Sequence, residues 1–488
     1  MRSLLTLFSI ILVSLSLQAQ QFTGLTQGTR SGINGARINP ANIADSRSWL
    51  DINLFSVDLF EENNFMYIPS ENYYIGKLFQ KKPNWRDYEG QPFMDYYEKG
   101  RKWDAFTQVY SQLPSAMLNI GNHGFGIQLN MRQHANLNGV DNHISKFMVN
   151  GLSFSPLQDT LLTSKGFDFR QASWLEAGLS YAFVFRQHLK NHWSAGFTVK
   201  KVFGMNSFFM NTANTEYIVY DDSTLHVTNT DLEYGYSPSP GVGNEIVDFS
   251  GGLFNGSGWA FDVGVVFQKK LEGNGFKRTS VLCAQTYDNY IFKLGLSVID
   301  VGWITFNQGA SQRSVKNAEI YWSNLNSYKF NGMGQFTQDL ALHSSPASEE
   351  TDKEFKMFLP AAASLQFDWR IQQGWYANLT VVHGLPIGEL RLNAPAYIAL
   401  SPRYESRILE VNLPMILYDL SKPRIGFSVR VFGITIGTDY LNTLFGFHDF
   451  TGFDIYLGFK IKLEKGFCVK ELSHFLRGRN YYGISCPD

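Results

Sequence analysis

The stretch FDIYLGFKIKL, residues 453–463, decides the fold class. Large apolar side chains at positions 453, 455, 457, 459, 461 and 463 alternate without a break with Asp454, Tyr456, Gly458, Lys460 and Lys462. This is the period of a strand with two unlike faces, and about eleven residues can cross a bilayer as a tilted strand. A soluble β-sandwich could also use one such strand, so the fold class depends on whether the rest of the chain repeats this pattern.

The composition narrows the fold class. The chain has 488 residues, of which 44% are hydrophobic, 15% aromatic and only 17% charged, a low charged share for a soluble domain. Beyond the N-terminus no apolar run is long enough for a membrane-spanning helix, whereas a β-barrel stays possible because alternation dilutes its apolar residues. The net charge of −1 does not suggest a nucleic-acid partner.

The first nineteen residues are typical of a signal peptide. Arg2 precedes an apolar run over residues 4–17, and Leu17-Gln18-Ala19 matches a cleavage site. A single-span anchor is disfavoured because the run is too short. We therefore expect an exported protein, in which Cys468 and Cys486 pair as a disulfide and Cys283 is left over; metal binding by three such widely spaced cysteines is disfavoured.

Strand-like segments recur along the mature chain, and their even number is typical of bacterial outer-membrane barrels. About fourteen are predicted, at residues 48–60, 115–121, 124–137, 172–187, 193–204, 258–270, 289–301, 357–371, 375–384, 396–404, 407–414, 424–431, 433–440 and 453–463.

The lengths of the links between these segments alternate. Links after even-numbered strands are mostly short, whereas those after odd-numbered strands include the long stretches 61–114, 138–171, 205–257 and 302–356. Outer-membrane barrels show this asymmetry, with tight periplasmic turns and long extracellular loops. Link 271–288, which holds Cys283, departs from this rule because it follows an even-numbered strand but is long. The sequence thus predicts an all-β, transmembrane antiparallel β-barrel over residues 48–463, followed by a short periplasmic tail, 464–488.

The first long link, 61–114, is rich in aromatic residues. Tyrosine and tryptophan often anchor protein interfaces, so the candidate partner contacts are Trp85, Tyr88, Tyr96, Tyr97 and Trp103. The alternative is that the loop packs on itself over the barrel mouth, which is at least as well supported.

No residue pattern predicts catalysis, a metal or a cofactor. The segments 178–182 and 426–430 are near misses to a nucleophile elbow, but both lie inside predicted strands, where alternate glycine and serine indicate a lumen face. His188 and His192 fall in a predicted turn, which disfavours a metal site.

The segment Asn39-Pro40-Ala41 lies in a Gly/Ala-rich stretch that has neither a helix nor a strand period. Together with the barrel strands, it resembles the long-chain fatty-acid transporter (FadL) class of outer-membrane barrels. The phrases LPSA (113–116), NGSG (255–258) and LSPRY (400–404) are similar to PorV-like members, and most of all to an uncharacterised Bacteroidota family of that class. The resemblance implies an N-terminal plug inside the barrel, made here of residues 20–47. The tail departs from this class, whose members usually end at the last strand.

Charged residues on the predicted lumen faces leave two interpretations open. They could line a pore, or they could pair with one another and with the plug; their balanced signs favour pairing. They are Glu176, Lys200, Asp262, Lys293, Asp368, Arg430, Asp454, Lys460 and Lys462.

Three functions follow, in order of preference. The first is a non-enzymatic docking or accessory subunit of an envelope complex, the second a FadL-like transporter of hydrophobic small molecules, and the third an outer-membrane hydrolase. The expected partners are outer-membrane lipid, including lipopolysaccharide, and other outer-membrane or periplasmic proteins. Both termini are expected in the periplasm.

Overall fold

The computed structural model describes residues 23–44, 46–70, 72, 87–88, 91–92, 94–98, 103–188, 190–238, 253–271, 289–330, 332–446 and 448–463. The predicted signal peptide, Trp85, Cys283 and the tail with Cys468 and Cys486 lie outside these residues. Among the described residues, no helix is long and apolar enough to cross a bilayer.

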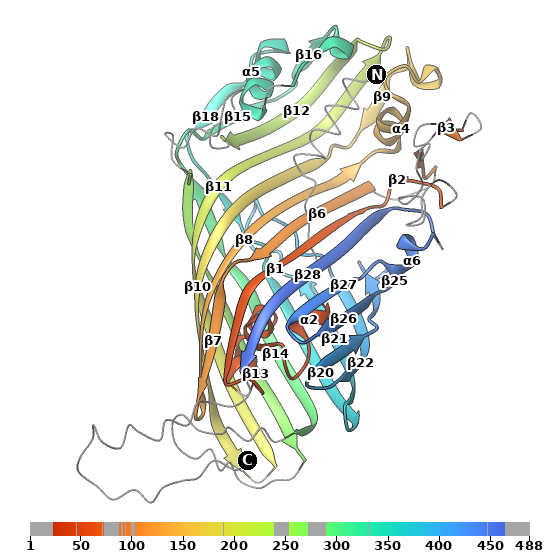
Figure 1. Cartoon of the computed structure of the whole chain (residues 1–488). Helices are drawn as coiled ribbons and strands as arrows, with labels where there is room; N and C mark the ends of the chain where they lie inside the picture. Colours follow the sequence, from red (N-terminus) through yellow and green to blue (C-terminus); the bar gives the residue numbers. More distant parts are fainter. Residues whose placement is uncertain are drawn as a thin grey trace, which may run out of the picture.

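The chain forms a closed antiparallel barrel of fourteen strands (Figure 1). It closes where the first strand pairs with the last, from Leu50 opposite Leu463 to Glu62 opposite Gly452. In order, the wall consists of β1 (Leu50–Asn63), β6 (Trp103–Gln112) with β7 (Ser115–Ile120), β8 (His123–Val140), β10 (Asp168–His188), β11 (Asn191–Val219), β13 (Gly256–Lys270), β14 (Tyr290–Phe306), β19 (Phe355–Phe358) with β20 (Ala362–Gln372), β21 (Trp375–Gly384), β22 (Tyr397–Glu405), β23 (Leu409–Asn412) with β24 (Met415–Tyr418), β25 (Lys422–Ile425) with β26 (Phe427–Val431), β27 (Ile434–Thr438) and β28 (Gly452–Leu463).

The wall confirms the fold class and the number of strands. In β28, the side chains of Ile455, Leu457 and Phe459 are exposed on the outer surface, whereas Tyr456 and Lys460 are buried inside. The same alternation of exposed and buried residues runs along β10 and β13. An outer surface of bulky apolar side chains around a polar interior is the arrangement of transmembrane β-barrels.

Prolines divide several wall strands into two pieces. A proline has no N–H to donate to a neighbouring strand, so it interrupts the hydrogen-bond ladder. Pro114 separates β6 from β7, Pro360 separates β19 from β20, and Pro414 separates β23 from β24. Opposite the last break, Gly426 N–H donates to the carbonyl oxygen of Pro414 at 2.7 Å, which preserves the wall.

One end of the barrel has tight turns, as the link lengths predict. Gly121 and Gly374 adopt positive φ angles of +60° and +80° in two of these turns, and Phe432 adopts +53° in a third. A positive φ suits glycine because it has no Cβ. We call this end the short-turn end; it is the lower end in Figure 1.

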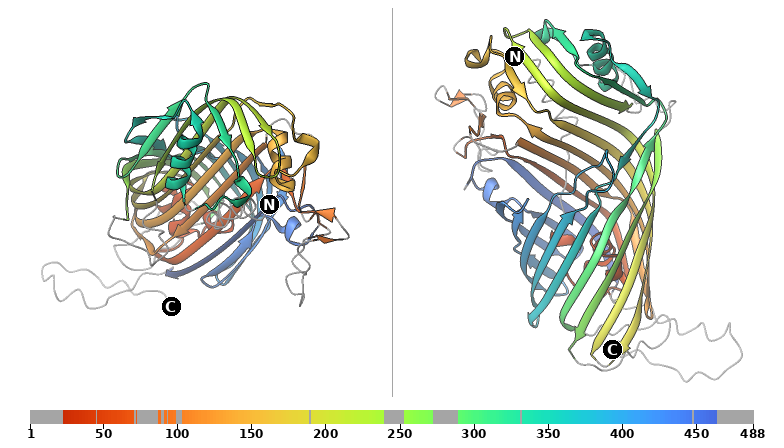
Figure 2. Two further views of the ribbon diagram at one scale, coloured as in Figure 1. Left: turned by 90° about the horizontal axis from the view of Figure 1, so that it is seen from above. Right: turned by 180° about the vertical axis from the view of Figure 1, so that it is seen from behind.

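At the opposite end, the predicted long links contain much regular structure that the sequence pattern did not indicate. β6 occupies the end of link 61–114, and β11 continues past residue 204 to pair with β12. The wall therefore rises as a tall sheet on one side (Figure 2). The additional elements are β2 (Met66–Tyr67), β3 (Asp87–Tyr88), β4 (Gln91–Pro92), β5 (Asp95–Tyr96), α4 (Asn142–Asn150), η3 (Ser155–Leu157), β9 (Leu162–Ser164), β12 (Leu225–Ser237), β15 (Ser311–Val315), β16 (Glu319–Trp322), η5 (Leu325–Ser327), α5 (Met333–His343), β17 (Ser344–Ser345), β18 (Glu349–Asp352) and α6 (Leu441–Leu444).

Candidate functional site in the barrel lumen

The N-terminal part of the described chain lies inside the barrel. It forms three short turns of helix, α2 (Thr23–Thr26), η1 (Gly32–Arg37) and η2 (Pro40–Ile43), in the lower half of the lumen (Figure 1). Its glycines and Pro40 disfavour a longer helix. We call residues 23–48 the inner segment. Most of its side chains are buried, so its polar backbone groups are enclosed by protein rather than lipid.

The inner segment is anchored at Asn39-Pro40-Ala41, the three residues singled out by the sequence. Asn39 Oδ1 accepts a hydrogen bond from Ala41 N at 3.0 Å and so caps η2, which Pro40 opens. The other side of the same amide faces the wall, where Nδ2 donates to Gln366 Oε1 at 3.0 Å and to Val265 O at 3.2 Å. One side chain therefore shapes the turn and attaches it to two strands.

The wall receives this turn on a row of small residues, which we call the small-residue seat. Consecutive register partners across five strands are Gly124, Ala182, Gly196, Gly264 and Ser297. An added Cβ would lie 2.7 Å from Ala41 N at Gly196, and 2.2 Å from Asn39 Oδ1 at Gly264. The inner segment thus approaches the wall at distances that only glycine allows.

Replacing Gly264 by alanine should loosen the inner segment. The new methyl group would displace the Asn39 amide and its hydrogen bonds, which are worth about 1 kcal/mol each. Trypsin should then cleave after Arg37 or Arg47 about tenfold faster in detergent-solubilised barrels. The matched control is Gly178→Ala on β10, where the added Cβ meets its nearest atom at 3.4 Å. Equal cleavage rates in the two variants would contradict the role of the seat.

Above the seat, five buried charged side chains form one network, the charge cluster. Asp300 Oδ2 accepts from Arg132 Nη1 at 2.8 Å, and Asp300 Oδ1 accepts from Lys200 Nζ at 2.6 Å. Lys200 also contacts Asp262 at 2.8 Å, and Arg132 contacts Glu176 at 3.6 Å. Two cations and three carboxylates on five strands thereby neutralise most of one another's charge, as buried ions require.

A bulge in β14 directs Asp300 into the lumen. The register between β13 and β14 shifts between Phe261 and Val263, and Asp300 has a φ of +57°. Aspartate tolerates this region better than most residues. Its N–H donates to Asp262 Oδ1 at 2.7 Å, so the bulge is held by a member of the charge cluster.

The lumen wall formed by β1, β6 and the C-terminal strands is aromatic. The guanidinium of Arg424 lies 3.8 Å from the ring centroid of Tyr418 and 4.2 Å from that of Tyr440, which are cation–π distances. We call this side the aromatic wall; its buried rings are Phe60, Phe106, Tyr110, Tyr397, Tyr418, Tyr440 and Tyr456. Within the described residues, the hydroxyls of Tyr397 and Tyr440 have no hydrogen-bond partner.

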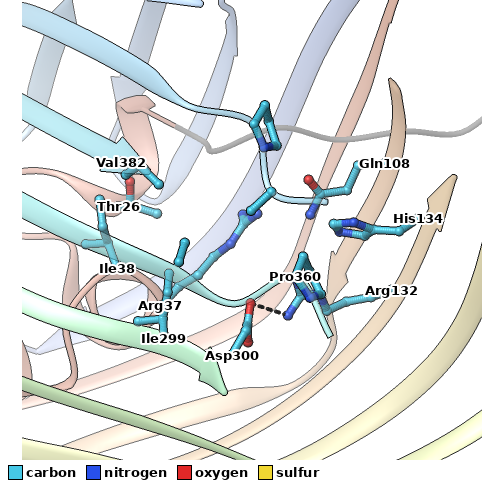
Figure 3. Close-up of a pocket in the computed structure, with 13 residues that line it drawn as sticks. Thr26, Arg37, Ile38, Gln108, Arg132, His134, Ile299, Asp300, Pro360 and Val382 are labelled. Carbon is cyan, nitrogen blue, oxygen red and sulfur yellow. Dashed lines mark hydrogen bonds and ion pairs between the residues drawn. The ribbon is translucent and has the colours of Figure 1, made fainter. Parts of the chain in front are cut away.

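A small cavity of about 50 Å³ borders the charge cluster, and Arg132 and Asp300 of the cluster line it (Figure 3). Arg37 and Ile38 of the inner segment line it together with Arg132 and His134 of β8. His134 is 2% exposed, and in the described part of the chain neither of its ring nitrogens has a hydrogen-bond partner. The cavity can hold one or two waters or a polar group of a small molecule.

The structure supports pairing of most of the predicted lumen charges, although within the described residues Lys462 Nζ has no hydrogen-bond partner. Asp368 accepts two hydrogen bonds of 2.8 Å from Arg403, and Arg430 contacts Glu410 at 2.6 Å. Lys460 Nζ donates to the carbonyl oxygen of Arg30 at 3.0 Å, so the wall also pairs with the inner segment. Sequence reasoning missed Arg132, Asp300 and Arg403. The break that Asp300 makes in the alternation of β14 was the one available signal.

The aromatic residues predicted to contact a partner differ in how far the structure describes them and in how exposed they are. Trp85 lies outside the described residues, and the side chain of Tyr88 is not among those described. Trp103 is 3% exposed and packs with Phe65 and Val140, so it is not available to a partner. Tyr96 and Tyr97 are half-buried; burial raises the pKa of Tyr97 to about 12. This outcome agrees with the alternative in which the loop packs on itself.

Within the described residues, no group of three or more His, Cys, Asp or Glu side chains could hold a metal ion. Ser180, in the first near-miss elbow, lies within β10 and shares a hydrogen bond of 2.8 Å with Thr198 Oγ1. It therefore lies on the lumen face, without the strand-to-helix turn of a nucleophile elbow.

The solved structures that are similar to this chain include hydrocarbon channels. A TodX deltaS2S3 mutant monoaromatic hydrocarbon channel is 9% identical, with 92% of this chain and 100% of that one covered and a TM-score of 0.43. The Ralstonia pickettii toluene transporter TbuX is 8% identical, with 90% and 96% covered and a TM-score of 0.38. A Pseudomonas aeruginosa FadL homologue is 8% identical, with 91% and 98% covered and a TM-score of 0.22. At these scores the likenesses carry no argument about function.

Among curated proteins, none matches the chain. One family model does match, and it covers residues 40–439. That range begins at Pro40 of the inner segment and ends just before the link to the last strand, so it contains most of the barrel. The chain therefore belongs to the family described as "Family of unknown function (DUF5723)".

Proposed function

We propose that the protein is a channel of the bacterial outer membrane for small, mainly apolar molecules that carry a polar group. The inner segment is its plug. The observation that carries the proposal is the lumen itself, which holds an aromatic wall, a charge cluster, and a cavity bordered by that cluster and by the inner segment. An apolar ring could pass along the aromatic wall, while a polar group is received by His134 or Arg132.

The inner segment is suited to such a role because its attachment is reversible. It is held by hydrogen bonds such as those of Asn39 and by ion pairs such as Arg37 with Asp58 at 3.7 Å. Each such contact is worth about 1 kcal/mol in net terms, so a shift of part of the segment is accessible without unfolding the barrel. The surrounding wall, closed by long antiparallel ladders, would stay intact.

The direction of insertion follows from the link lengths. The short-turn end faces the periplasm, and the tall sheet of β11, β12 and β15 projects from the cell. A chain that is exported and inserted in this way has both termini in the periplasm. The docking role preferred from the sequence has less support than transport, because Trp103, one of its candidate contact residues, is buried.

Filling the cavity should block passage. Ala362 on β20 is buried and lines the cavity, whereas its neighbour Ala363 points outward. We expect Ala362→Trp to reduce the uptake of the fluorescent probe N-phenyl-1-naphthylamine by intact cells to the level of cells without the protein. Ala363→Trp should leave uptake unchanged. The two variants carry the same extra volume, so any general effect of tryptophan on folding is controlled.

If neither the unmodified protein nor a form that lacks residues 23–46 raises probe uptake above the background, the lumen is not a path for such molecules and the channel proposal is wrong. The heat-modifiable mobility of each variant on gels checks that its barrel is folded.

A further inference from the structure

A second cavity, of about 480 Å³, lies at the short-turn end. Its volume falls within the usual range of small-ligand sites. The turn after β20, the turn after β22 and the inner segment meet there, and they contribute Gly374, Ser406 and Arg47 respectively. The cavity is therefore formed by both the rim of the barrel and the inner segment.

The lining of this cavity is strongly basic. Arg30, Arg47, Arg370 and Arg407 line it against a single carboxylate, Glu405, which leaves three positive charges in excess. The carboxylate is already engaged, since Glu405 contacts Arg403 at 3.4 Å and Arg30 at 3.5 Å. Like charges repel one another at such a site, and a bound anion would remove that repulsion.

Two of the arginines are available to a ligand. Within the part of the chain that the structure describes, neither the Arg370 nor the Arg407 side chain makes a hydrogen bond or an ion pair. Arg47 is oriented by Asn289, whose Oδ1 accepts from Nη2 at 2.6 Å. Guanidinium groups bind phosphate through paired N–H donors, so the preferred ligand group is a phosphate.

Large exposed apolar side chains flank, in sequence, the residues that line the cavity. Ile371, Trp375 and Ile408 are 52%, 47% and 50% exposed, and each is next in sequence to a residue that lines the cavity. We call these three residues the apolar collar. Since the outer surface of the wall faces hydrocarbon, the collar would contact lipid chains. The ligand that satisfies both surfaces has a phosphate at one end and acyl chains at the other.

We propose that this cavity binds the phosphate group of a phospholipid of the inner leaflet, whose acyl chains lie on the apolar collar. The bound headgroup joins Arg370 and Arg407 of the rim to Arg30 and Arg47 of the inner segment. This site is independent of the lumen cavity, and it would exist whether or not the protein is a channel.

The test is native mass spectrometry of the full mature chain, titrated with phosphatidylglycerol in detergent. The double variant Arg370→Gln/Arg407→Gln should bind the lipid at least tenfold more weakly, because two charge-assisted contacts are lost. The matched control is Arg186→Gln, an exposed arginine near the turn after β10 at the same end of the barrel. It should bind like the unmodified protein. The heat-modifiable mobility of each variant verifies folding.

Two competitors separate the sources of the phosphate group. Diacylglycerol, which has the chains without the phosphate, should not displace the lipid, and inorganic phosphate should displace it only weakly. If inorganic phosphate binds as tightly as phosphatidylglycerol, the cavity is a free-phosphate site and the lipid assignment is wrong. Equal lipid binding by the double variant and by Arg186→Gln would overturn the site as a whole.

Discussion

Deletion of residues 23–46 from the mature chain should convert a closed barrel into one that gives steady current steps in planar bilayers. The deleted residues occupy the lower lumen and form the small turns that rest on the small-residue seat. Barrels only slightly wider than fourteen strands enclose an aqueous channel when nothing fills them. The unmodified chain should give rare, brief openings, because its inner segment moves only in part.

The control for this deletion replaces residues 23–46 by a Gly/Ser linker of equal length. The linker keeps the chain inside the barrel but lacks Asn39, Arg37 and the apolar contacts of Ile33 and Ile43. If packing closes the lumen, the linker form should conduct almost as well as the deletion. If both forms remain as closed as the unmodified chain, the inner segment is not a plug.

Much of the barrel could be predicted because a bilayer imposes one rule on every wall strand. Lipid contact demands apolar side chains on one face, so alternation marked the fourteen segments, and Pro360 and Pro414 interrupted their ladders without removing them. Above the membrane that demand ends. There β12 pairs with the upper part of β11, and β6 pairs with β1 and β8; the mixed faces of these strands resembled loops.

The site was only partly predictable, because it depends on register between strands. Asn39-Pro40-Ala41 could be selected as a turn within a small-residue segment, and balanced signs indicated paired lumen charges. The small-residue seat, by contrast, requires Gly124, Gly196 and Gly264 to be aligned across neighbouring strands. The second cavity, at the short-turn end, brings together residues more than three hundred positions apart, such as Arg30 and Arg407. Such alignments follow from the register of the closed barrel, and no local sequence pattern predicts them.

The replacement Asp300→Asn should destabilise the barrel by about 3 kcal/mol, because Arg132 and Lys200 each lose a short buried hydrogen bond to a carboxylate. Asp300 accepts from both Arg132 and Lys200, at 2.8 and 2.6 Å. Asparagine is nearly the same size and also tolerates a positive φ, so the bulge at φ +57° can persist. The change therefore isolates the charge from the backbone conformation.

The measurement is urea unfolding of the barrel in lipid vesicles, followed by tryptophan fluorescence, with Asp222→Asn in an exposed turn as the control. That control should leave the midpoint unchanged. A second variant, Lys200→Gln, completes a double-mutant cycle: the double variant should lose less stability than the two single losses together, because it removes both members of one pair. Additive losses, or a midpoint for Asp300→Asn equal to that of the control, would mean that the charge cluster does not act as a network. In that case the lumen would be filled by side chains whose charges are independently solvated, and water would have to reach Arg132 through the cavity beside His134.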